Sequence, residues 1–332
     1  MLSLPKGYKS HLNIRDTEIA VKLIKDYFEK CFAKKLKLSR VSAPLFVKAK
    51  SGLNDNLSGV ERPIIFETKD GNSCEVVHSL AKWKRLALKK YEYCIDEGIY
   101  ADINAIRCDE DTDNLHSIYV DQWDWERIIL NSNRNLKYLK LVVSEIYKTI
   151  KRTETFIVGV YSHLKPFLPS HITFISAQEL ENTYPTMTSK ERESIVAKKY
   201  GAVFLIGIGN KMTSGNIHES RAPDYDDWSL NGDIIIHYPL LNISMEISSM
   251  GIRVDSSTLI KQLEENDCIY RAKLPFQQSL LKGELPQTIG GGIGQSRLCM
   301  LLLQKAHIGE VQSSIWPDEM LNKCHLANIH LL

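Results

Sequence analysis

Apolar residues recur at helical spacing in three stretches of the chain. The first runs from Thr17 to Leu36, with Asp16 or Thr17 in a position to cap it. The second covers Leu136 to Ile150, and the third covers Lys190 to Tyr200, just before Gly201. A glycine at that point suits the left-handed conformation that ends many helices. The pattern therefore predicts three amphipathic helices.

Between these helices, short runs rich in β-branched and aromatic residues predict strands. The predicted strands are Glu75–Val77, Ile103–Arg107, Ser117–Glu126, Ile172–Ile175, Val203–Ile208, Asp233–Tyr238 and Met245–Met250. They do not alternate strictly with helices, which favours an α+β fold with a mostly antiparallel sheet flanked by helices. Because no linker rich in proline, serine or glycine divides the chain, we expect a single domain over residues 1–332.

Composition narrows the class of protein. The 332 residues are 43% hydrophobic and 25% charged, as in ordinary globular proteins. Lys and Arg number 42 against 40 Asp and Glu, so the chain lacks the basic excess of a dedicated nucleic-acid binder. Seven scattered cysteines form no C-x-x-C pair. With no secretory signal and no apolar run of about 20 residues, we expect a cytoplasmic protein with no membrane or nucleic-acid partner.

Familiar single motifs are absent. The glycine run at 290–294 fails the dinucleotide fingerprint because residue 295 is glutamine, and no phosphate-binding P-loop is present. Asp109, Asp111 and Asp113 imitate the start of a calcium loop. However, Asn114 and Val120 stand where such a loop needs its glycine and its bidentate glutamate.

Polar and aromatic residues alternate along the predicted strand 118–126. Side chains at alternate positions share a face and lie about 7 Å apart. One face carries Val120, Gln122, Asp124 and Glu126, and the other carries Tyr119, Asp121, Trp123 and Trp125. The polar face is either a solvated surface opposite an aromatic core or a wall that binds a ligand.

Two further features suggest anion binding, each with a simpler alternative. Arg107 ends a predicted strand, and its guanidinium could hold a phosphate or simply pair with the acidic run that follows. The segment Gly290 to Arg297 leads into the apolar helix 298–303. Glycines let a backbone approach a ligand and helix amino ends favour anions, but a flexible turn before a core helix has the same composition.

Taken together, these three features resemble the class II aminoacyl-tRNA synthetase catalytic core. Over residues 41 to 309, the chain more specifically resembles the aspartate–ammonia ligase family of ammonia-dependent asparagine synthetases. The matching runs are residues 55–59, 75–85, 120–127, 221–229, 230–233, 248–254 and 286–297. The resemblance implies ATP-dependent amidation of L-aspartate by ammonia through a β-aspartyl-adenylate, releasing AMP and diphosphate. It also implies a homodimer, because Pro44 in residues 41–45 matches the dimer-forming motif of that core.

The resemblance assigns ATP, a co-substrate, and Mg²⁺ to particular residues. Arg107 would bind the α-phosphate and the reacting carboxylate, and Arg297 the γ-phosphate and adenine. Asp233 and Glu246 would bind Mg²⁺, although Glu246 taken alone is typical of an exposed strand residue. The other implied ATP-binding residues are Leu115, His116, Val120, Gly292 and Gly294.

For aspartate, the resemblance directs Lys84 and Arg253 at the α-carboxylate. Taken alone, the basic stretch Lys82 to Lys90 is typical of a solvated helix face. The substrate ammonium group would meet Asp55, Gln122 and Asp124, and the remaining implied contacts are Ser79, Ser249, Arg221 and Asp226. Asp55, Arg107 and Gln122 are the expected catalytic residues, and we hypothesise that Asp55 takes a proton from ammonium.

Two other functions stay open. A tRNA-charging enzyme for aspartate or asparagine would share this core but normally adds an anticodon-binding barrel. The predicted helix near Thr17 leaves too few residues for one. A catalytically silent relative is the second alternative, and the presence of every expected phosphate and metal position argues against it. The chain also departs from the family pattern at Cys108, where a proline is usual, and in the glycine-poor segment 50–54.

Overall fold

An eight-stranded mixed sheet forms the centre of the protein in the computed structural model, which describes residues 2–55, 57 and 61–332. The strand order is β1-β5-β6-β11-β10-β9-β8-β7. Pairing is antiparallel from β5 through to β8, and parallel only at the two edges, β1–β5 and β7–β8. The strands are β1 (Leu38–Arg40), β5 (Gly98–Ile106), β6 (Tyr119–Ile128), β7 (Thr173–Ser176), β8 (Ala202–Ile206), β9 (Asp226–Tyr238), β10 (Ile243–Arg253) and β11 (Thr288–Gly294). The mostly antiparallel α+β architecture is confirmed.

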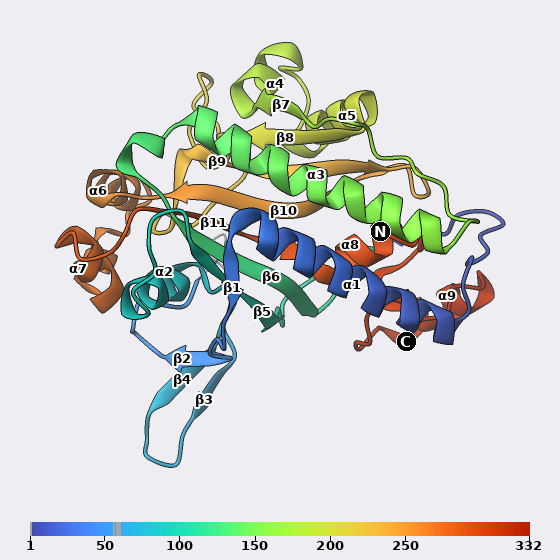
Figure 1. The fold of residues 1–332 in the computed structure, drawn as a ribbon, viewed down its shortest axis with the longest axis horizontal. Helices are drawn as coiled ribbons and strands as arrows, with labels where there is room; N and C mark the ends of the chain where they lie inside the picture. Colours follow the sequence, from blue (N-terminus) through green and yellow to red (C-terminus); the bar gives the residue numbers. More distant parts are fainter. Residues whose placement is uncertain (1, 56, 58–60) are drawn as a thin grey trace.

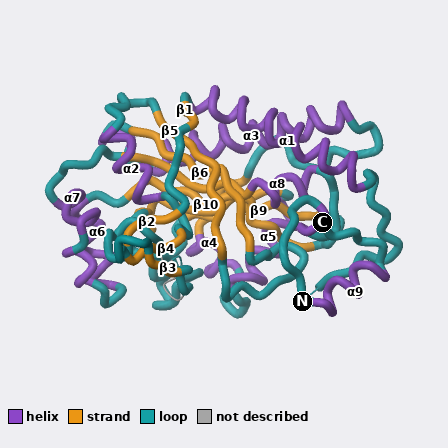
Figure 2. Tube along the Cα trace, turned by 90° about the horizontal axis from the view of Figure 1, so that it is seen from below, coloured by secondary structure: helices purple, strands orange, loops and turns teal. Residues whose placement is uncertain are grey.

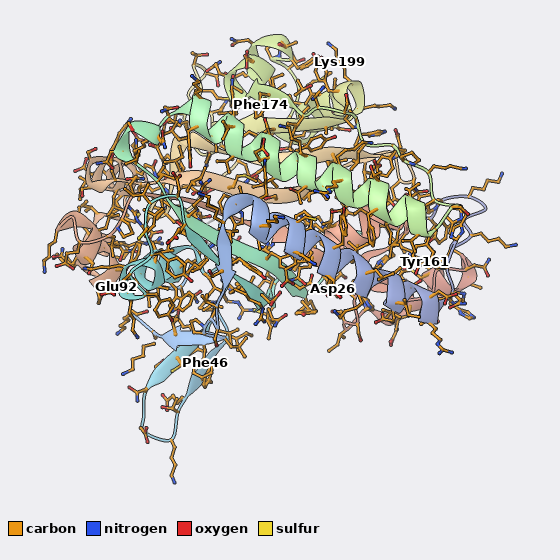
Figure 3. All side chains as sticks on the ribbon, in the orientation of Figure 1. Asp26, Phe46, Glu92, Tyr161, Phe174 and Lys199 are labelled. Atoms are coloured by element: carbon orange, nitrogen blue, oxygen red, sulfur yellow. The ribbon has the colours of Figure 1, made fainter. Side chains whose placement is uncertain are left out.

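Two long helices, α1 (Ile14–Leu36) and α3 (Leu136–Val160), lie side by side across one face of this sheet (Figure 1). The Tyr27 and Phe156 rings stack between them, with centroids 4.0 Å apart. Phe28 of α1 packs on Trp123 of β6 at 4.8 Å. Side chains fill the layer between the helices and the sheet (Figure 3), and Figure 2 shows the same layering from below.

The helix predictions hold with shifted ends. Helix α1 begins at Ile14 rather than Thr17, because the Asn13 side chain accepts a hydrogen bond from Asp16 N at 2.9 Å and caps it. Helix α3 continues ten residues beyond the predicted end at Ile150. Helix α5 (Ser189–Tyr200) ends at Gly201 as predicted, and the φ of this glycine is positive at +77°, but its ψ of −40° differs from that of the left-handed helical conformation.

Shorter elements complete the fold. A three-stranded sheet of β2 (Phe46–Lys48), β4 (Ser73–Val76) and β3 (Ile65–Glu67) protrudes from the body (Figure 1). The remaining helices are α2 (Ala81–Lys90), α4 (Ala177–Thr183), α6 (Ser256–Glu265), α7 (Pro275–Leu281), α8 (Gln295–Leu302) and α9 (Asp318–Leu326), with 3-10 turns η1 (Asn131–Asn133), η2 (Ile269–Lys273) and η3 (Ile308–Glu310). Within the described residues, none of these helices has the length and apolarity that crossing a bilayer requires.

Strand β6 has a buried aromatic face, as predicted. Trp123 and Trp125 are completely buried beneath α1. The opposite face is buried too, with Asp124 only 3% exposed and Glu126 not exposed at all. The interpretation of this face as a solvated surface is therefore wrong, because α2 packs over it and supplies Lys84 as a charge partner.

Candidate active site

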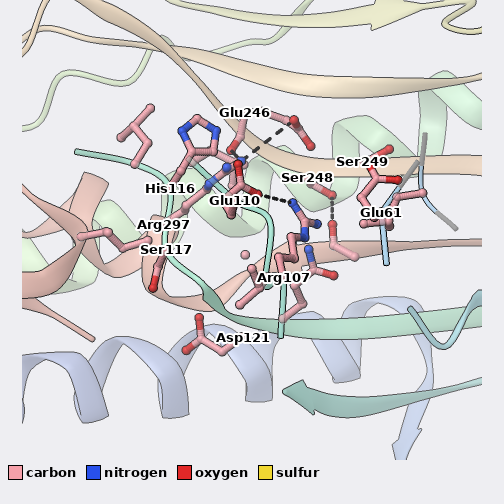
Figure 4. A pocket seen from close by; sticks show the side chains of 18 of the residues that line it. Glu61, Arg107, Glu110, His116, Ser117, Asp121, Glu246, Ser248, Ser249 and Arg297 are labelled. Atoms are coloured by element: carbon pink, nitrogen blue, oxygen red, sulfur yellow. Dashed lines mark hydrogen bonds and ion pairs between the residues drawn. The ribbon is translucent and has the colours of Figure 1, made fainter. Parts of the chain in front are cut away.

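A cavity of about 360 Å³ opens over the polar side of β6 (Figure 4). Its walls come from the segment between β5 and β6, from β10, from the end of β11 and from the start of α8. The predicted site residues that line it are Arg107, Leu115, His116, Val120, Gln122, Arg221, Glu246, Ser249, Gly292, Gly294 and Arg297. Side chains predicted from five separated stretches of the sequence thus meet in one place.

Arg107 and Arg297 supply the cationic part of this cavity. Arg107 follows β5, and its Nη1 lies 3.5 Å from the Glu110 carboxylate, so part of the alternative interpretation is confirmed. Its Nε is buried and has no hydrogen-bond partner among the described residues. Arg297, in the first turn of α8, donates to the Glu246 backbone oxygen at 3.0 Å. Both guanidinium groups face one space and can bind phosphate there.

Glu246 of β10 lines the cavity, whereas Asp233 of β9 is not in its lining and contacts the lining residue Arg221. Asp233 is 3% exposed and forms an ion pair with Arg221. Burial raises the pKa of Asp233 to about 8, and the nearby Glu246 carboxylate adds to this increase. Asp233 Oδ1 has no partner within the described part of the chain. Two hard oxygen donors, one of them unsatisfied, beside a cavity able to take phosphates, fit the preferences of Mg²⁺.

These donors do not amount to a complete protein cage. Among residues 2–55, 57 and 61–332, no group of three or more His, Cys, Asp or Glu side chains is arranged to hold a metal. Mg²⁺ usually keeps waters and is bound through one or two carboxylates together with substrate phosphates. The pair is consistent with that mode of binding.

A buried ionic network lies directly behind the cavity. Lys84 is fully buried, forms an ion pair with Asp124 and donates to the Trp125 backbone oxygen at 2.8 Å. The alternative interpretation of this basic stretch as a solvated helix face is wrong at Lys84, because α2 packs against the sheet through this side. Burial lowers the pKa of Lys84. The side chain is held as a cation by the acids around it.

The same network continues on β10 through Arg253. Its guanidinium donates to both oxygens of Glu126 and also to Asp226. Burial raises the pKa of Asp226 to about 6, although Arg253 opposes this increase. Lys84 and Arg253 thus already have acidic partners, and neither is among the described residues that line the cavity. Their role toward the substrate's α-carboxylate stays a prediction.

The other predicted aspartate contacts divide between the cavity and its surroundings. Gln122, Ser249 and Arg221 line the cavity. Asp55 is 2% exposed and does not line the cavity, but it accepts a hydrogen bond at 2.9 Å from the backbone N of Leu57, which does. The Ser79 hydroxyl accepts from Ala81 N at 3.0 Å.

The glycines of β11 make room for the polar side chains of β6. A Cβ at Gly290 would lie 2.1 Å from Glu126 Oε2, and one at Gly292 would lie 2.5 Å from Gln122 Oε1. The flexible-turn interpretation is wrong because residues 288–294 form a paired strand between β6 and β10. Here glycine permits close packing within the sheet and, at Gly292 and Gly294, forms the cavity wall.

The amino end of α8 already has an anion. Ser296 N donates to Asp121 Oδ1 at 3.0 Å, and the Ser296 hydroxyl donates to Asp121 Oδ2 at 2.8 Å. Lys25 of α1 and Gln312 also donate to this carboxylate. This helix end therefore binds the carboxylate of Asp121, where the sequence pattern predicts an anionic group of a ligand.

The segment containing Leu115 and His116 is shaped by Asp113. One Asp113 oxygen accepts from Leu115 N at 2.7 Å, from His116 N at 2.9 Å and from His116 Nδ1 at 2.9 Å. Although burial opposes it, the hydrogen bonds from His116 lower the pKa of Asp113 to about 2. The acidic run that imitates a calcium loop is instead a turn that presents two cavity residues.

Several residues that line the cavity were not predicted. They include Glu110, Asp121, Lys190, Glu219, Ser248 and Gln312. Lys190 and Glu219 come from distant segments whose composition is that of ordinary solvated surface. Only tertiary packing brings them to the cavity, so no local signal could have identified them.

Solved structures share this architecture. Asparaginyl-tRNA synthetase from Pyrococcus horikoshii, complexed with asparaginyl-adenylate, matches with a TM-score of 0.67 at 13% identity, over 92% of this chain and 72% of that one. The Entamoeba histolytica asparaginyl-tRNA synthetase complex matches with a TM-score of 0.62 at 14% identity, over 90% of this chain and 66% of that one. The fold is that of a class II aminoacyl-tRNA synthetase-like catalytic core.

Sequence comparison identifies the family within that class. The model of a family described as aspartate–ammonia ligase matches residues 15–328. Aspartate–ammonia ligase of Clostridium perfringens strain 13 is 59% identical, over 100% of this chain and 99% of its own length. That of Ruminiclostridium cellulolyticum is 57% identical, over 99% of this chain and 98% of its own. The chain belongs to the aspartate–ammonia ligase family, which confirms the predicted resemblance.

Proposed function

We propose that the protein, as a single catalytic domain over residues 1–332, converts L-aspartate, ammonia and ATP to L-asparagine, AMP and diphosphate. The reaction passes through a β-aspartyl-adenylate. The observation that carries this proposal is the meeting of Arg107 and Arg297 in one cavity, beside the carboxylates of Asp233 and Glu246. The identity of 57–59% to aspartate–ammonia ligases, over at least 99% of this chain, supports the same reaction.

In the first half-reaction, the protein aligns the aspartate side-chain carboxylate with the α-phosphorus of ATP. Arg107 binds the α-phosphate, and Arg297 binds the γ-phosphate and the adenine. The same cavity is lined by Leu115, His116, Val120, Gly292 and Gly294. In this proposal these residues contact the nucleotide. A fixed pair of cations stabilises the charge that develops as diphosphate leaves.

Asp233 and Glu246 would hold Mg²⁺ on this side of the cavity. The ion would supply charge neutralisation to the ATP phosphates when bound. The unsatisfied Asp233 oxygen supports this role. Replacing Asp233 with Asn should raise the Mg²⁺ concentration needed for half-maximal adenylate formation.

Aspartate would bind between Gln122, Ser249 and Arg221, which line the cavity. Asp124, Asp226 and Ser79 lie behind these residues. To bind Lys84 and Arg253, the substrate's α-carboxylate must compete for these two cations with the carboxylates that already hold them. These are Asp124, Glu126 and Asp226. Substrate binding would therefore be coupled to a rearrangement of the buried network.

Asp55 would accept a proton from ammonium in the second half-reaction. Burial raises the pKa of Asp55, which makes its carboxylate a stronger proton acceptor than an exposed aspartate. An Asp55→Asn variant should still form the adenylate but turn it over with ammonium far more slowly. Unaltered turnover would exclude this role.

We also propose a homodimer. Exposed apolar side chains lie beside the Pro44 motif, with Leu45 55%, Phe46 45% and Ile65 60% exposed. Burial of this surface would stabilise a pair of subunits. Sedimentation velocity would give the mass of the particle. A cytoplasmic location and independence from nucleic acid stay predictions.

The decisive experiment incubates the purified protein with ATP, Mg²⁺, aspartate and ammonium in the absence of tRNA. Formation of asparagine, AMP and diphosphate supports the proposal. Formation of ADP would contradict an adenylate intermediate. Adenylate formation without asparagine release favours a tRNA-charging enzyme, and complete inactivity of folded protein favours a silent relative.

A further inference from the structure

A buried polar cluster lies next to the cavity wall. Its members are Asp55, His78, Lys82, Asp224 and Gln277, all at most 3% exposed. We call it the Asp55–Asp224 cluster. It is continuous with the active site, because Leu57 and Tyr225, close in sequence to its two acids, line the cavity.

Direct contacts hold the cluster together. Lys82 Nζ donates to Asp224 Oδ2 at 3.1 Å, and Gln277 Nε2 donates to the same oxygen at 2.8 Å. His78 Nδ1 lies 3.1 Å from the Asp55 backbone oxygen. Lys82, Asp224 and His78 all act electrostatically on Asp55, which places the two acids near each other.

Four buried atoms of this cluster have no hydrogen-bond partner among the described residues: Asp55 Oδ2, His78 Nε2, Asp224 Oδ1 and Gln277 Oε1. The first and third are carboxylate oxygens, and an ionised carboxylate can accept hydrogen bonds but cannot donate them. Gln277 must point its amide nitrogen at the Asp224 carboxylate, which leaves its oxygen free. His78 must donate from Nδ1 to a carbonyl oxygen, and in the tautomer that carries its proton on Nδ1 the Nε2 atom is an acceptor.

The charge of the cluster favours binding of a cation. Within the described residues, Lys82 forms an ion pair with Asp224 and acts on Asp55 only electrostatically, without a direct contact. Arg271 acts on Asp224 only from a half-buried position on η2. Burial without full compensation is unfavourable and raises the pKa of Asp55. A small cation that donates several hydrogen bonds would satisfy both the charge and the free acceptors.

We propose that Asp55 and Asp224 bind the substrate ammonium ion in this cluster, with Gln277 and His78 as further acceptors. This inference rests on the proposed function and assigns Asp224 and Gln277 to the ammonia half-reaction. Ammonium transfers one proton to Asp55, and the nitrogen lone pair of the resulting ammonia forms the C–N bond at the β-carbonyl carbon. The C–O bond to AMP breaks, AMP leaves with that electron pair, and the second proton passes to solvent.

Steady-state kinetics of two variants test the site. Asp224→Asn removes one charge while keeping shape, and Gln277→Met removes one acceptor. Loss of a charge-assisted hydrogen bond should raise the KM for ammonium about tenfold or more in Asp224→Asn, and severalfold in Gln277→Met. Aspartate-dependent ATP–diphosphate exchange should be unchanged. So should turnover with hydroxylamine, which is largely uncharged at neutral pH.

The matched control is Asp227→Asn. Asp227 is also buried, but it forms an ion pair with Arg134, away from the cluster. The KM of the Asp227→Asn variant for ammonium should therefore stay within about twofold of that of the unmodified protein. An ammonium KM unchanged in both test variants, with exchange intact, would overturn the inference. Absence of exchange in the unmodified protein would instead overturn the proposed function.

A measurement on the unmodified protein covers variants that fail to fold. Ammonium chloride should raise the midpoint of thermal unfolding more than an equal concentration of tetramethylammonium chloride, whose ion cannot donate hydrogen bonds. Equal effects of the two salts would count against a buried ammonium site.

Discussion

Arg253 binds Glu126 through two guanidinium nitrogens inside the central sheet, with N–O distances of 2.7 to 3.1 Å. The two residues are 127 positions apart in the sequence, on β10 and β6. Strand β11 runs between these strands, and its Gly290 leaves the space through which they meet. The pair thus joins three neighbouring strands behind the active-site cavity.

Removing one member of this pair should be strongly destabilising. Among the described residues, Glu126→Gln leaves the buried Arg253 with Asp226 as its one acidic ion-pair partner, and it weakens the hold on Lys84. We expect a loss of about 3–5 kcal/mol in the free energy of unfolding, measured by urea denaturation. Asp102→Asn breaks the exposed pair with Arg40 and should cost less than about 1 kcal/mol. Similar losses in both variants would contradict the structural importance of the buried pair.

A methyl group at Gly290 should have an effect opposite to one at Gly159. In Gly290→Ala the new Cβ would lie 2.1 Å from Glu126 Oε2 and 2.6 Å from Arg253 Nη2, so the pair must separate. We expect destabilisation of about 1–3 kcal/mol or more. Gly159 is in α3 with nothing within 4 Å of such a Cβ, and Gly159→Ala should stabilise by about 0.5–1 kcal/mol. Thermal unfolding of the two variants measures the contrast.

Loss of the Arg107 cation should impair adenylate formation. We expect Arg107→Ala to lower aspartate-dependent ATP–diphosphate exchange by well over tenfold, about 1.4 kcal/mol or more of transition-state stabilisation. Arg40→Ala removes an arginine whose side chain is 59% exposed and outside the cavity lining, so exchange should be unaffected. Nearly normal exchange in folded Arg107→Ala would exclude a phosphate contact.

Asn114 should act on nucleotide binding from outside the cavity. It is 3% exposed, its side chain donates to the backbone oxygens of Ser3 and Ala306 at 2.8 Å each, and it precedes Leu115 in the cavity wall. Asn114→Ala should loosen this segment and raise the KM for ATP by about threefold to tenfold, since each lost hydrogen bond is worth about 0.5–1.5 kcal/mol. The KM for aspartate should stay unchanged.

The control for Asn114 is Asn135→Ala. Asn135 caps α3 by accepting from Tyr138 N at 3.0 Å, on the exposed surface. Its loss should cost about 1 kcal/mol of stability without changing the KM for ATP. A KM for ATP that rises equally in both variants would show that general destabilisation, rather than the segment's shape, is responsible.

Stability should fall in acid through His307. Burial lowers the pKa of His307 from 6.5 to about 4, so between these values the unfolded chain binds the proton and the folded protein does not. The neutral ring therefore contributes fully above pH 6.5, and about 3 kcal/mol is lost as pH falls toward 4.

Comparison with His307→Asn isolates this contribution, since Asn retains an acceptor for Gly309 N. Glu310 lies beside His307, and burial raises its pKa, which has the opposite effect on stability in acid. Glu310 is present in both proteins, so the difference between them reports His307. Parallel curves of unfolding free energy against pH would contradict the prediction.

Elements stabilised by contacts between residues close in the sequence could be predicted, and elements that need distant partners could not. Helices α1, α3 and α5 follow from periodicity within their own residues, although the cap at Asn13 and the last ten residues of α3 depend on local geometry and packing that periodicity does not show. Strands β1, β2 and β3 are three residues long, too short for an alternating pattern, and form only where a partner strand is present.

The sequence by itself determined the amphipathic helices, the mostly antiparallel α+β class, the family and many of the residues of the cavity. Tertiary structure alone decided the environment of each charge. Lys84, on a strongly basic helix, is fully buried because Asp124, 40 positions away, meets it on the face of the sheet that α2 covers. A charged side chain leaves water only where an opposite charge and hydrogen bonds replace its hydration, and those partners come from distant parts of the chain.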